Sequence, residues 1–181
     1  MTTSELIVDI NTANKELFKE TEKGEKFYTI PIYIRGGEIL ALISGYLLKE
    51  INGRAKLKGY LESTSIREPR EHMFTYFYIN EMSQVSEDTP LTNKVSVSGK
   101  ITKINKLITR TNGKHVLPIV ISRVAGEKQT SVLHAAFTDA DARKMNTLRD
   151  KRYNITAEGY ITTRNTAIEV SIETYSLTER R

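Results

Sequence analysis

The sequence has no cysteine and no tryptophan among its 181 residues, and no apolar run approaches the roughly 18 residues of a membrane-spanning helix. Without cysteine, the chain cannot form disulfides, thiolate nucleophiles, iron–sulfur clusters or cysteine-based zinc sites. The N-terminal segment MTTSELIVDI also lacks the basic and apolar regions of a signal peptide. We therefore expect a cytoplasmic protein that does not associate with a membrane.

Motifs for catalysis and for metal or nucleotide binding are also missing. The sequence contains neither GxxxxGKS/T nor GxGxxG, and its histidines, His72, His115 and His134, have no metal-ligand spacing such as HExxH. Asp139 and Asp141 are explained better as the start of a helix than as an acid pair. We expect no catalytic residues, no metal site and no cofactor, and an enzyme is the class that the sequence favours least.

Charge is distributed unevenly along the chain. The total is 27 Lys and Arg against 22 Asp and Glu, a formal net charge of +5. Residues 1–88 hold 11 basic and 14 acidic residues, a net charge of −3, whereas residues 89–181 hold 16 basic and 8 acidic residues, a net charge of +8. A basic half favours a polyanionic partner, because neutralising phosphates releases their counterions. The alternative is a surface that only keeps the protein soluble.

The second half of the chain alternates apolar and polar residues, which is typical of β-strands. We predict strands at residues 95–104, 116–124, 131–137, 153–163 and 167–177. Residues 138–149 predict a short helix between the third and fourth of these strands, because Ala142, Met145 and Leu148 recur at helical spacing. Thr138 is placed to cap the start of this helix.

The first half shows the same pattern less regularly. We predict strands at residues 6–10, 26–35, 38–43, 54–63 and 72–85. Residues 45–51 predict a helix of one or two turns, and the alternating Glu and Lys of residues 15–26 indicate a solvated charged segment. Tyr76 and Tyr78 share one face of their strand and Phe77 takes the other. If this aromatic face is exposed, it would either stack on bases or form a domain or subunit interface. The negative charge of this half favours the interface.

The two halves repeat each other in sequence. The matching segments, in the same order, are IPIYIR at 30–35 with LPIVISR at 117–123, and KGYL at 58–61 with EGYI at 158–161. Residues 86–92 between the halves are typical of a short linker. We therefore expect two domains, residues 1–86 and residues 93–181, each the size of a small barrel. The alternative is chance similarity between β-rich segments.

Three strands, a helix and two strands follow the order of an OB-fold, a five-stranded Greek-key barrel that binds oligonucleotides. The segment NKVSVSGKI at residues 93–101 resembles the first-strand pattern N-x-V-x-L-x-G-x-L of bacterial single-stranded DNA-binding proteins. Phe137 stands where that family carries a Phe before its helix. Residues 148–164, LRDKRYNITAEGYITTR, resemble the family's pattern L-R-K-G-x-x-V-x-I-E-G-x-L-R-T-R. The second half thus resembles this family over most of its length.

The whole chain resembles the tandem version of this family seen in Firmicutes, their phages and conjugative elements, in which a degenerate first OB domain precedes a recognisable second one. The resemblance implies an all-β fold with short helices: two tandem OB-fold five-stranded Greek-key barrels, the degenerate one at 1–86 and the DNA-binding one at 93–181. It implies sequence-independent binding and protection of single-stranded DNA in replication, recombination or DNA transfer. It also implies a homo-oligomer, in which a dimer of tandem domains supplies the four barrels that the family often assembles.

Two features depart from the family's pattern. The third strand has no Trp and reads Thr130-Ser131-Val132, and the sequence ends at Arg181 without the acidic tail that recruits replication and repair proteins. These departures leave two other functions open. One is an OB-fold accessory protein that binds mainly protein partners in replication restart or conjugation. The other is an RNA-binding OB module.

Binding a single strand needs cations for its phosphates and flat rings for its bases. The residues that we predict to bind nucleic acid are Lys100, Lys103, Lys106, Arg110, Lys114, Arg123, Phe137, Arg149, Lys151, Arg152, Tyr160 and Arg164. Several fall on the strand 2–3 face or in the loops that OB-folds use. His115 and Tyr153 are further stacking candidates. For Phe137 the alternative is a place in the core, and for each basic residue it is an ordinary solvated side chain.

Overall fold

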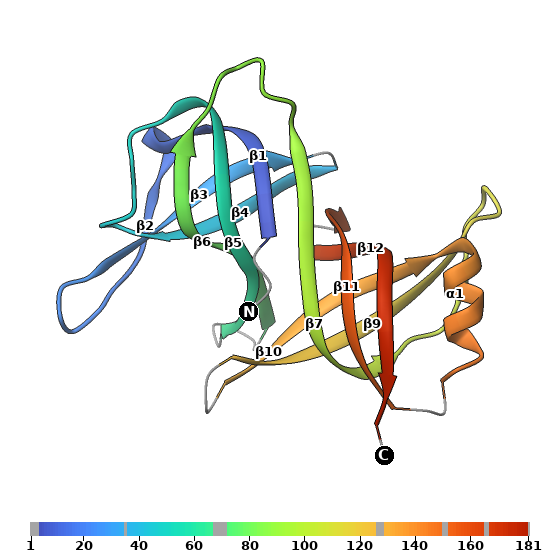
Figure 1. Ribbon diagram of the computed structural model, residues 1–181. Coiled ribbons are helices and arrows are strands. Elements are labelled where there is room, and N and C mark those ends of the chain that lie inside the picture. Colours follow the sequence, from blue (N-terminus) through green and yellow to red (C-terminus); the bar gives the residue numbers. More distant parts are fainter. Residues whose placement is uncertain are drawn as a thin grey trace.

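The computed structural model describes residues 4–34, 36–66, 72–125, 129–149, 152–164 and 167–180, which form two strand-rich halves (Figure 1). The first half contains β1 (Ser4–Asn11), η1 (Thr12–Asn14), β2 (Glu16–Glu20), β3 (Lys26–Ile34), β4 (Gly37–Ser44), β5 (Asn52–Ile66) and β6 (His72–Gln84). The second half contains β7 (Thr92–Ile104), β8 (Ile108–Thr109), β9 (His115–Ala125), β10 (Gln129–Thr138), α1 (Asp139–Asn146), β11 (Tyr153–Arg164) and β12 (Ala167–Glu179). The long strands of each half follow the alternating apolar residues that predicted them.

The second half closes into a barrel. Its strands are hydrogen-bonded in the order β7-β11-β12-β10-β9, and β9 also pairs with β7. The pair β10–β12 is parallel, whereas the pairs that flank it are antiparallel. This is the five-stranded Greek-key order of an OB-fold.

The first half repeats this order as β1-β5-β6-β4-β3, with the parallel pair β4–β6 in the equivalent place. Its first and last strands, β1 and β3, lie against each other without a hydrogen-bonded ladder between their described residues. The first barrel is therefore less completely closed than the second. The predicted fold class, two tandem OB-fold five-stranded Greek-key barrels, is confirmed.

Two glycines mark the same irregularity in the two barrels. β5 shifts register against β6 at Gly59, and β11 shifts against β12 at Gly159. A Cβ at Gly59 would lie 1.9 Å from Tyr78 O, and a Cβ at Gly159 would lie 1.9 Å from Ser171 O. A β-bulge bends a strand where a barrel curves, and only glycine allows the adjacent backbone to come this close. The repeated Gly-Tyr of the sequence therefore reflects a repeat of barrel geometry.

Backbone pairing and buried polar contacts join the two barrels. β1 pairs antiparallel with β7, so one sheet continues from the first barrel into the second. The Ser63 hydroxyl donates to Val132 O (2.6 Å), and the Arg123 guanidinium donates to Leu61 O (2.6 Å). Buried apolar side chains from both halves belong to one continuous cluster. The two barrels thus fix each other's position.

The prediction of a helix at residues 45–51 is wrong, because this segment contains a turn and no helix. The N–H groups of Leu47 and Leu48 donate to Ser44 O (3.0 and 3.2 Å), which makes one turn of backbone. A single turn does not repay the entropy of nucleating a helix. The charged segment at residues 15–26 is mostly exposed, as expected, but it also contains β2, which pairs with β3.

The start of α1 also differs from the prediction. Thr138 precedes the helix with extended backbone, but its side chain makes no capping hydrogen bond. Asp139 follows with a positive φ of 50°, and its Oδ1 accepts a hydrogen bond from the His115 N–H (3.3 Å). The side chain of Asp139 therefore ties the helix start to β9. Ala142 and Met145 are fully buried, as their spacing predicted.

Candidate nucleic-acid interface

A cavity of about 400 Å³ opens beside the hairpin between β8 and β9. We call it the hairpin cavity, and its lining residues are Gly36, Arg110, Lys114, His115, Val116, Ala136, Thr138, Asp139, Tyr160, Thr162, Thr163, Glu169 and Ser171. At the hairpin tip the Arg110 N–H donates to Lys114 O (2.9 Å), which holds these two residues opposite each other. Both side chains are exposed, so two cations stand at the cavity rim.

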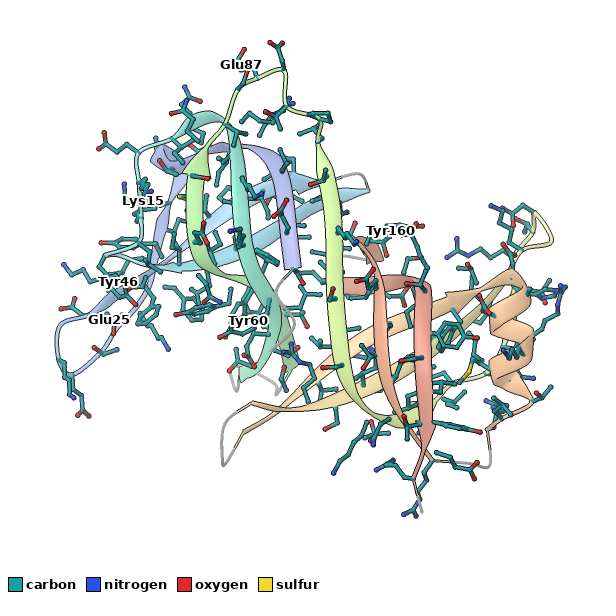
Figure 2. The ribbon with its side chains drawn as sticks, in the orientation of Figure 1. Lys15, Glu25, Tyr46, Tyr60, Glu87 and Tyr160 are labelled. Atoms are coloured by element: carbon teal, nitrogen blue, oxygen red, sulfur yellow. The ribbon has the colours of Figure 1, made fainter. Side chains whose placement is uncertain are left out.

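Tyr160 supplies an aromatic ring to the hairpin cavity (Figure 2). Side chains alternate along β11, so Ile161 is buried inside the barrel while Tyr160 lies on the outer face and is 39% exposed. The hydroxyls of Thr162 and Ser171 line the same face, and Asp139 and Glu169 add two carboxylates. The cavity can therefore hold a flat apolar group against the ring while the hairpin cations contact an anion.

A second cavity, of about 410 Å³, lies where β7 and β12 end and β11 begins. We call it the basic cavity, and its lining residues are Ile101, Thr102, Lys103, Ile104, Arg149, Arg152 and Arg180. Four of the seven are cationic and none is acidic. Three of the cations belong to the predicted set, whereas sequence analysis missed Arg180. The signal available for Arg180 was only its place in a terminal basic pair.

The remaining basic candidates are placed separately. Lys100 and Lys106 are exposed but line neither of these cavities. Lys151 and the side chain of Arg164 lie outside the described residues. The structure thus brings half of the predicted set together, in two groups: Lys103, Arg149 and Arg152 at the basic cavity, and Arg110, Lys114 and Tyr160 at the hairpin cavity.

Three predicted contacts need correction because their side chains are buried. Phe137 is 0% exposed and packs edge-on against Tyr175, with ring centroids 4.9 Å apart, so it belongs to the core. Tyr153 is only 7% exposed. Arg123 is 9% exposed, donates to Leu61 O and lies over the ring of Tyr60 at 5.8 Å. Residue type and spacing suggested these contacts, but the opposite barrel covers Arg123 and the barrel interior takes the two rings.

The first barrel carries a row of aromatic side chains on its outer face, which we call the aromatic row. Its members are Phe18, Tyr60, Phe74, Tyr76 and Tyr78. The rings of Tyr60 and Tyr78 stack at 5.2 Å, and those of Phe74 and Tyr76 lie 5.7 Å apart. Burial, helped by the charge of Glu62, raises the pKa of Tyr76 to about 12. Phe77 points into the core, as the alternation predicted.

No helix in the described part of the chain is long and apolar enough to cross a membrane. Within the same residues, His, Asp and Glu side chains do not gather into a group that could hold a metal ion.

The fold is that of a tandem OB-fold protein, and its second barrel carries two cavities lined in part by cations. The full chain superposes on the crystal structure of the wild-type single-stranded DNA binding protein from Thermus aquaticus, with a TM-score of 0.79 and 14% identity, covering 100% of this chain and 94% of that one. A deletion mutant of the same Thermus aquaticus protein gives a TM-score of 0.78 at 15% identity, covering 100% and 95%. No family model matches the chain, and no curated protein matches its sequence. At these identities the likeness establishes a shared fold across the entire chain.

Proposed function

We propose that this protein binds single-stranded DNA without sequence preference, mainly through its second barrel. The hairpin cavity carries this proposal, because it places one exposed aromatic ring beside two cations on an OB-fold. The full-length likeness to a single-stranded DNA binding protein supports it. A protein of this kind protects the strand and holds it extended, which is binding rather than catalysis.

In this proposal Tyr160 stacks on a base, while Arg110 and Lys114 contact the phosphates on either side. Every base presents a flat π-face, so stacking does not depend on sequence. The phosphate contacts add affinity that falls with salt, because they release counterions. No base edge has to be read for the strand to bind.

The sequence resemblance extends the proposal to the protein's setting. In this proposal the chain is a tandem single-stranded DNA-binding protein, with a first domain at residues 1–86 and a second at 93–181. The resemblance gives a role in replication, recombination or DNA transfer in the cytoplasm of Firmicutes, or for their phages and conjugative elements. The difference between −3 and +8 in net charge assigns strand binding to the second domain.

The proposal is tested by titrating the protein into fluorescent oligo-dT and, for comparison, into duplex DNA, at two salt concentrations. We expect the single strand to bind more tightly.

Tyr160→Ala should weaken binding by roughly 1–3 kcal/mol without changing the salt slope. Arg110→Ala should flatten the slope of log K against log salt by about 0.7. Arg143→Ala, on the exposed side of α1, is the matched control and should bind like the wild type. Equal affinity for duplex DNA, or unaltered binding by Tyr160→Ala, would contradict the proposal.

A second candidate function is protein binding through the aromatic row. Tyr76 is buried, but Phe18 is exposed and Phe74 and Tyr78 are half-buried, so part of the row is open to a partner. In a half with a net charge of −3, such rings suit a protein surface better than a nucleic acid. The occupant that we propose is a second copy of the chain, which gives a dimer with four barrels. Light scattering tests this, and a strict monomer at working concentration excludes the dimer. Competition between ribo- and deoxyribo-oligonucleotides of equal length tests the RNA alternative.

A further inference from the structure

The basic cavity lies at the opposite end of the second barrel from the hairpin cavity. Arg152 immediately precedes β11, whereas Tyr160 lies in the second half of that strand. Eight residues of strand separate them, which is roughly 26 Å at the usual rise of an extended chain. A small anion bound in the basic cavity therefore does not touch the hairpin cavity.

Backbone contacts hold the cations of the basic cavity in place. Nη2 of Arg149 donates to Asn105 O (2.6 Å), and Nη2 of Arg180 donates to Ile101 O (3.3 Å). The Arg180 N–H donates to Arg152 O (2.8 Å), which sets these two residues next to each other. The guanidinium groups of Arg149 and Arg180 are thus held before any ligand arrives, which lowers the side-chain entropy that binding costs.

A β-bulge in β7 sets the direction of the Lys103 side chain, the fourth cation of the basic cavity. The pairing of β7 with β9 shifts register between Ile101 and Lys103, and Thr102 bonds to Val120 O (3.3 Å) at this point. β-Bulges re-aim side chains and are enriched next to binding sites. Here the bulge places Lys103 on the cavity wall with Arg149 and Arg180.

Within the residues that the structure describes, no ion pair offsets the positive charge of the basic cavity. Nε of Arg180 is buried and has no hydrogen-bond partner there. Four like charges around one cavity repel one another, and a multivalent anion would relieve that repulsion.

We propose that the basic cavity is a phosphate-binding site. Phosphate oxygens accept several charge-assisted hydrogen bonds at once, and arginine offers donors in a matching planar arrangement. The phosphate comes from the backbone of a bound strand or from inorganic phosphate in solution. This site does not depend on strand binding in the hairpin cavity.

Thermal unfolding in inorganic phosphate and in chloride at equal ionic strength tests the site. Phosphate stabilises folded proteins in general because it is excluded from their surfaces. The informative quantity is therefore the difference in this stabilisation between each variant and the wild type. We expect phosphate to raise the melting temperature of the wild type and of Arg143→Gln by the same amount. Arg180→Gln should lose part of that rise, and Arg152→Gln, which changes an exposed side chain, should do the same.

Salt-dependent titration of the same variants with oligo-dT identifies the source of the phosphate. A salt slope flatter by about 0.7 in Arg180→Gln assigns the site to the strand backbone. An unchanged slope with a reduced phosphate effect assigns it to inorganic phosphate. If Arg180→Gln and Arg152→Gln change neither measurement relative to Arg143→Gln, the proposal is overturned. Unaltered oligo-dT binding by Tyr160→Ala would contradict the proposed function alone and leave the phosphate result standing.

Discussion

Burial divides the cationic side chains of the second barrel into two kinds. Arg110 and Lys114 project into solvent from a hairpin tip, where an arriving phosphate can reach them. Arg123 occupies a strand of the same barrel but is 9% exposed and bonded to Leu61 O in the first barrel. Arginine therefore joins the barrels at position 123, whereas at position 110 it is free to make the phosphate contact that we propose.

We predict that Arg123→Ala lowers the free energy of unfolding by about 1.5–3 kcal/mol, the worth of a hydrogen bond to a charged group. The change leaves Leu61 O without its donor and uncovers the ring of Tyr60. The salt slope of strand binding should stay the same. Urea unfolding measures the first effect and oligo-dT titration the second. Arg110→Ala should do the reverse, leaving the free energy of unfolding unchanged while flattening the salt slope. A flattened slope in Arg123→Ala would show that the side chain contacts phosphate after all.

Tyrosines with raised pKa values should make stability fall at high pH, and Tyr76 and Tyr175 show the large shifts. Burial raises the pKa of Tyr76 and Tyr175 from 10.0 to about 12, and for Tyr175 the hydrogen bond to Asp141 adds to the effect. The folded state then keeps these protons longer than the unfolded chain. Their contribution is complete below pH 10 and is lost between about pH 10 and 12.

Urea unfolding across that pH window measures the loss, and the tyrosinate absorbance reports the late titration directly. Tyr76→Phe should show a shallower fall of stability with pH than the wild type. Tyr46→Phe, at a side chain that is 77% exposed, is the matched control. Identical pH profiles for the wild type and Tyr76→Phe would refute the assignment.

At the scale of elements, the bulges in β5 and β11 allow the sheets to curve into barrels. Each occurs where a strand crosses close to the backbone of its neighbour, at Gly59 and at Gly159. The sequence repeat preserves this glycine although most surrounding residues differ. The two halves therefore share a bend at the same place in the barrel.

Gly159→Ala should destabilise the fold by about 1–3 kcal/mol, because its Cβ would overlap Ser171 O and force the backbone apart. Gly59→Ala should have a similar effect in the first barrel, where Tyr78 O is the obstacle. Thermal unfolding measures both changes. Thr156→Ala, on the exposed face of β11, serves as control and should change little. A Gly159→Ala variant as stable as the control would mean that the bulge tolerates a side chain.

At the scale of the whole molecule, the two barrels share a sheet and a buried polar seam. β1 pairs with β7, Ser63 bonds to Val132 O, and Thr163 returns a hydrogen bond from the second barrel to Gly36 O. Ser63 and Thr163 occupy equivalent places in the repeat, since each lies four residues after its bulge glycine. The seam is therefore nearly symmetric, with each barrel donating to the other.

We predict that the chain unfolds in a single cooperative transition, because neither barrel can leave without exposing the seam and part of the common apolar cluster. Differential scanning calorimetry should give equal calorimetric and van't Hoff enthalpies. The double variant Ser63→Ala and Thr163→Val, which removes two of the side-chain donors between the barrels, should let the barrels separate more easily. Two resolved transitions in the wild type would show that the barrels are energetically independent.

Most strands could be predicted from the sequence because alternation of apolar and polar residues is a local property. Residues 153–163 and 167–177 lie within β11 and β12, and the helix around Ala142 and Met145 follows its own spacing. The short strands β2 and β8 carry exposed residues on both faces, so they leave no such pattern. The predicted helix at residues 45–51 failed because apolar spacing over one turn does not outweigh the nucleation cost.

The sequence by itself determined the strand order, the internal repeat, the uneven charge and the side chains available for binding. Only the tertiary structure decided where those side chains lie. Alternation along a strand distinguishes two faces, but it does not reveal that the first barrel covers Arg123. Nor does it reveal that the ends of β7 and β12 bring Arg180 beside Lys103. These contacts join residues far apart in the chain, and long-range packing rather than local preference sets them.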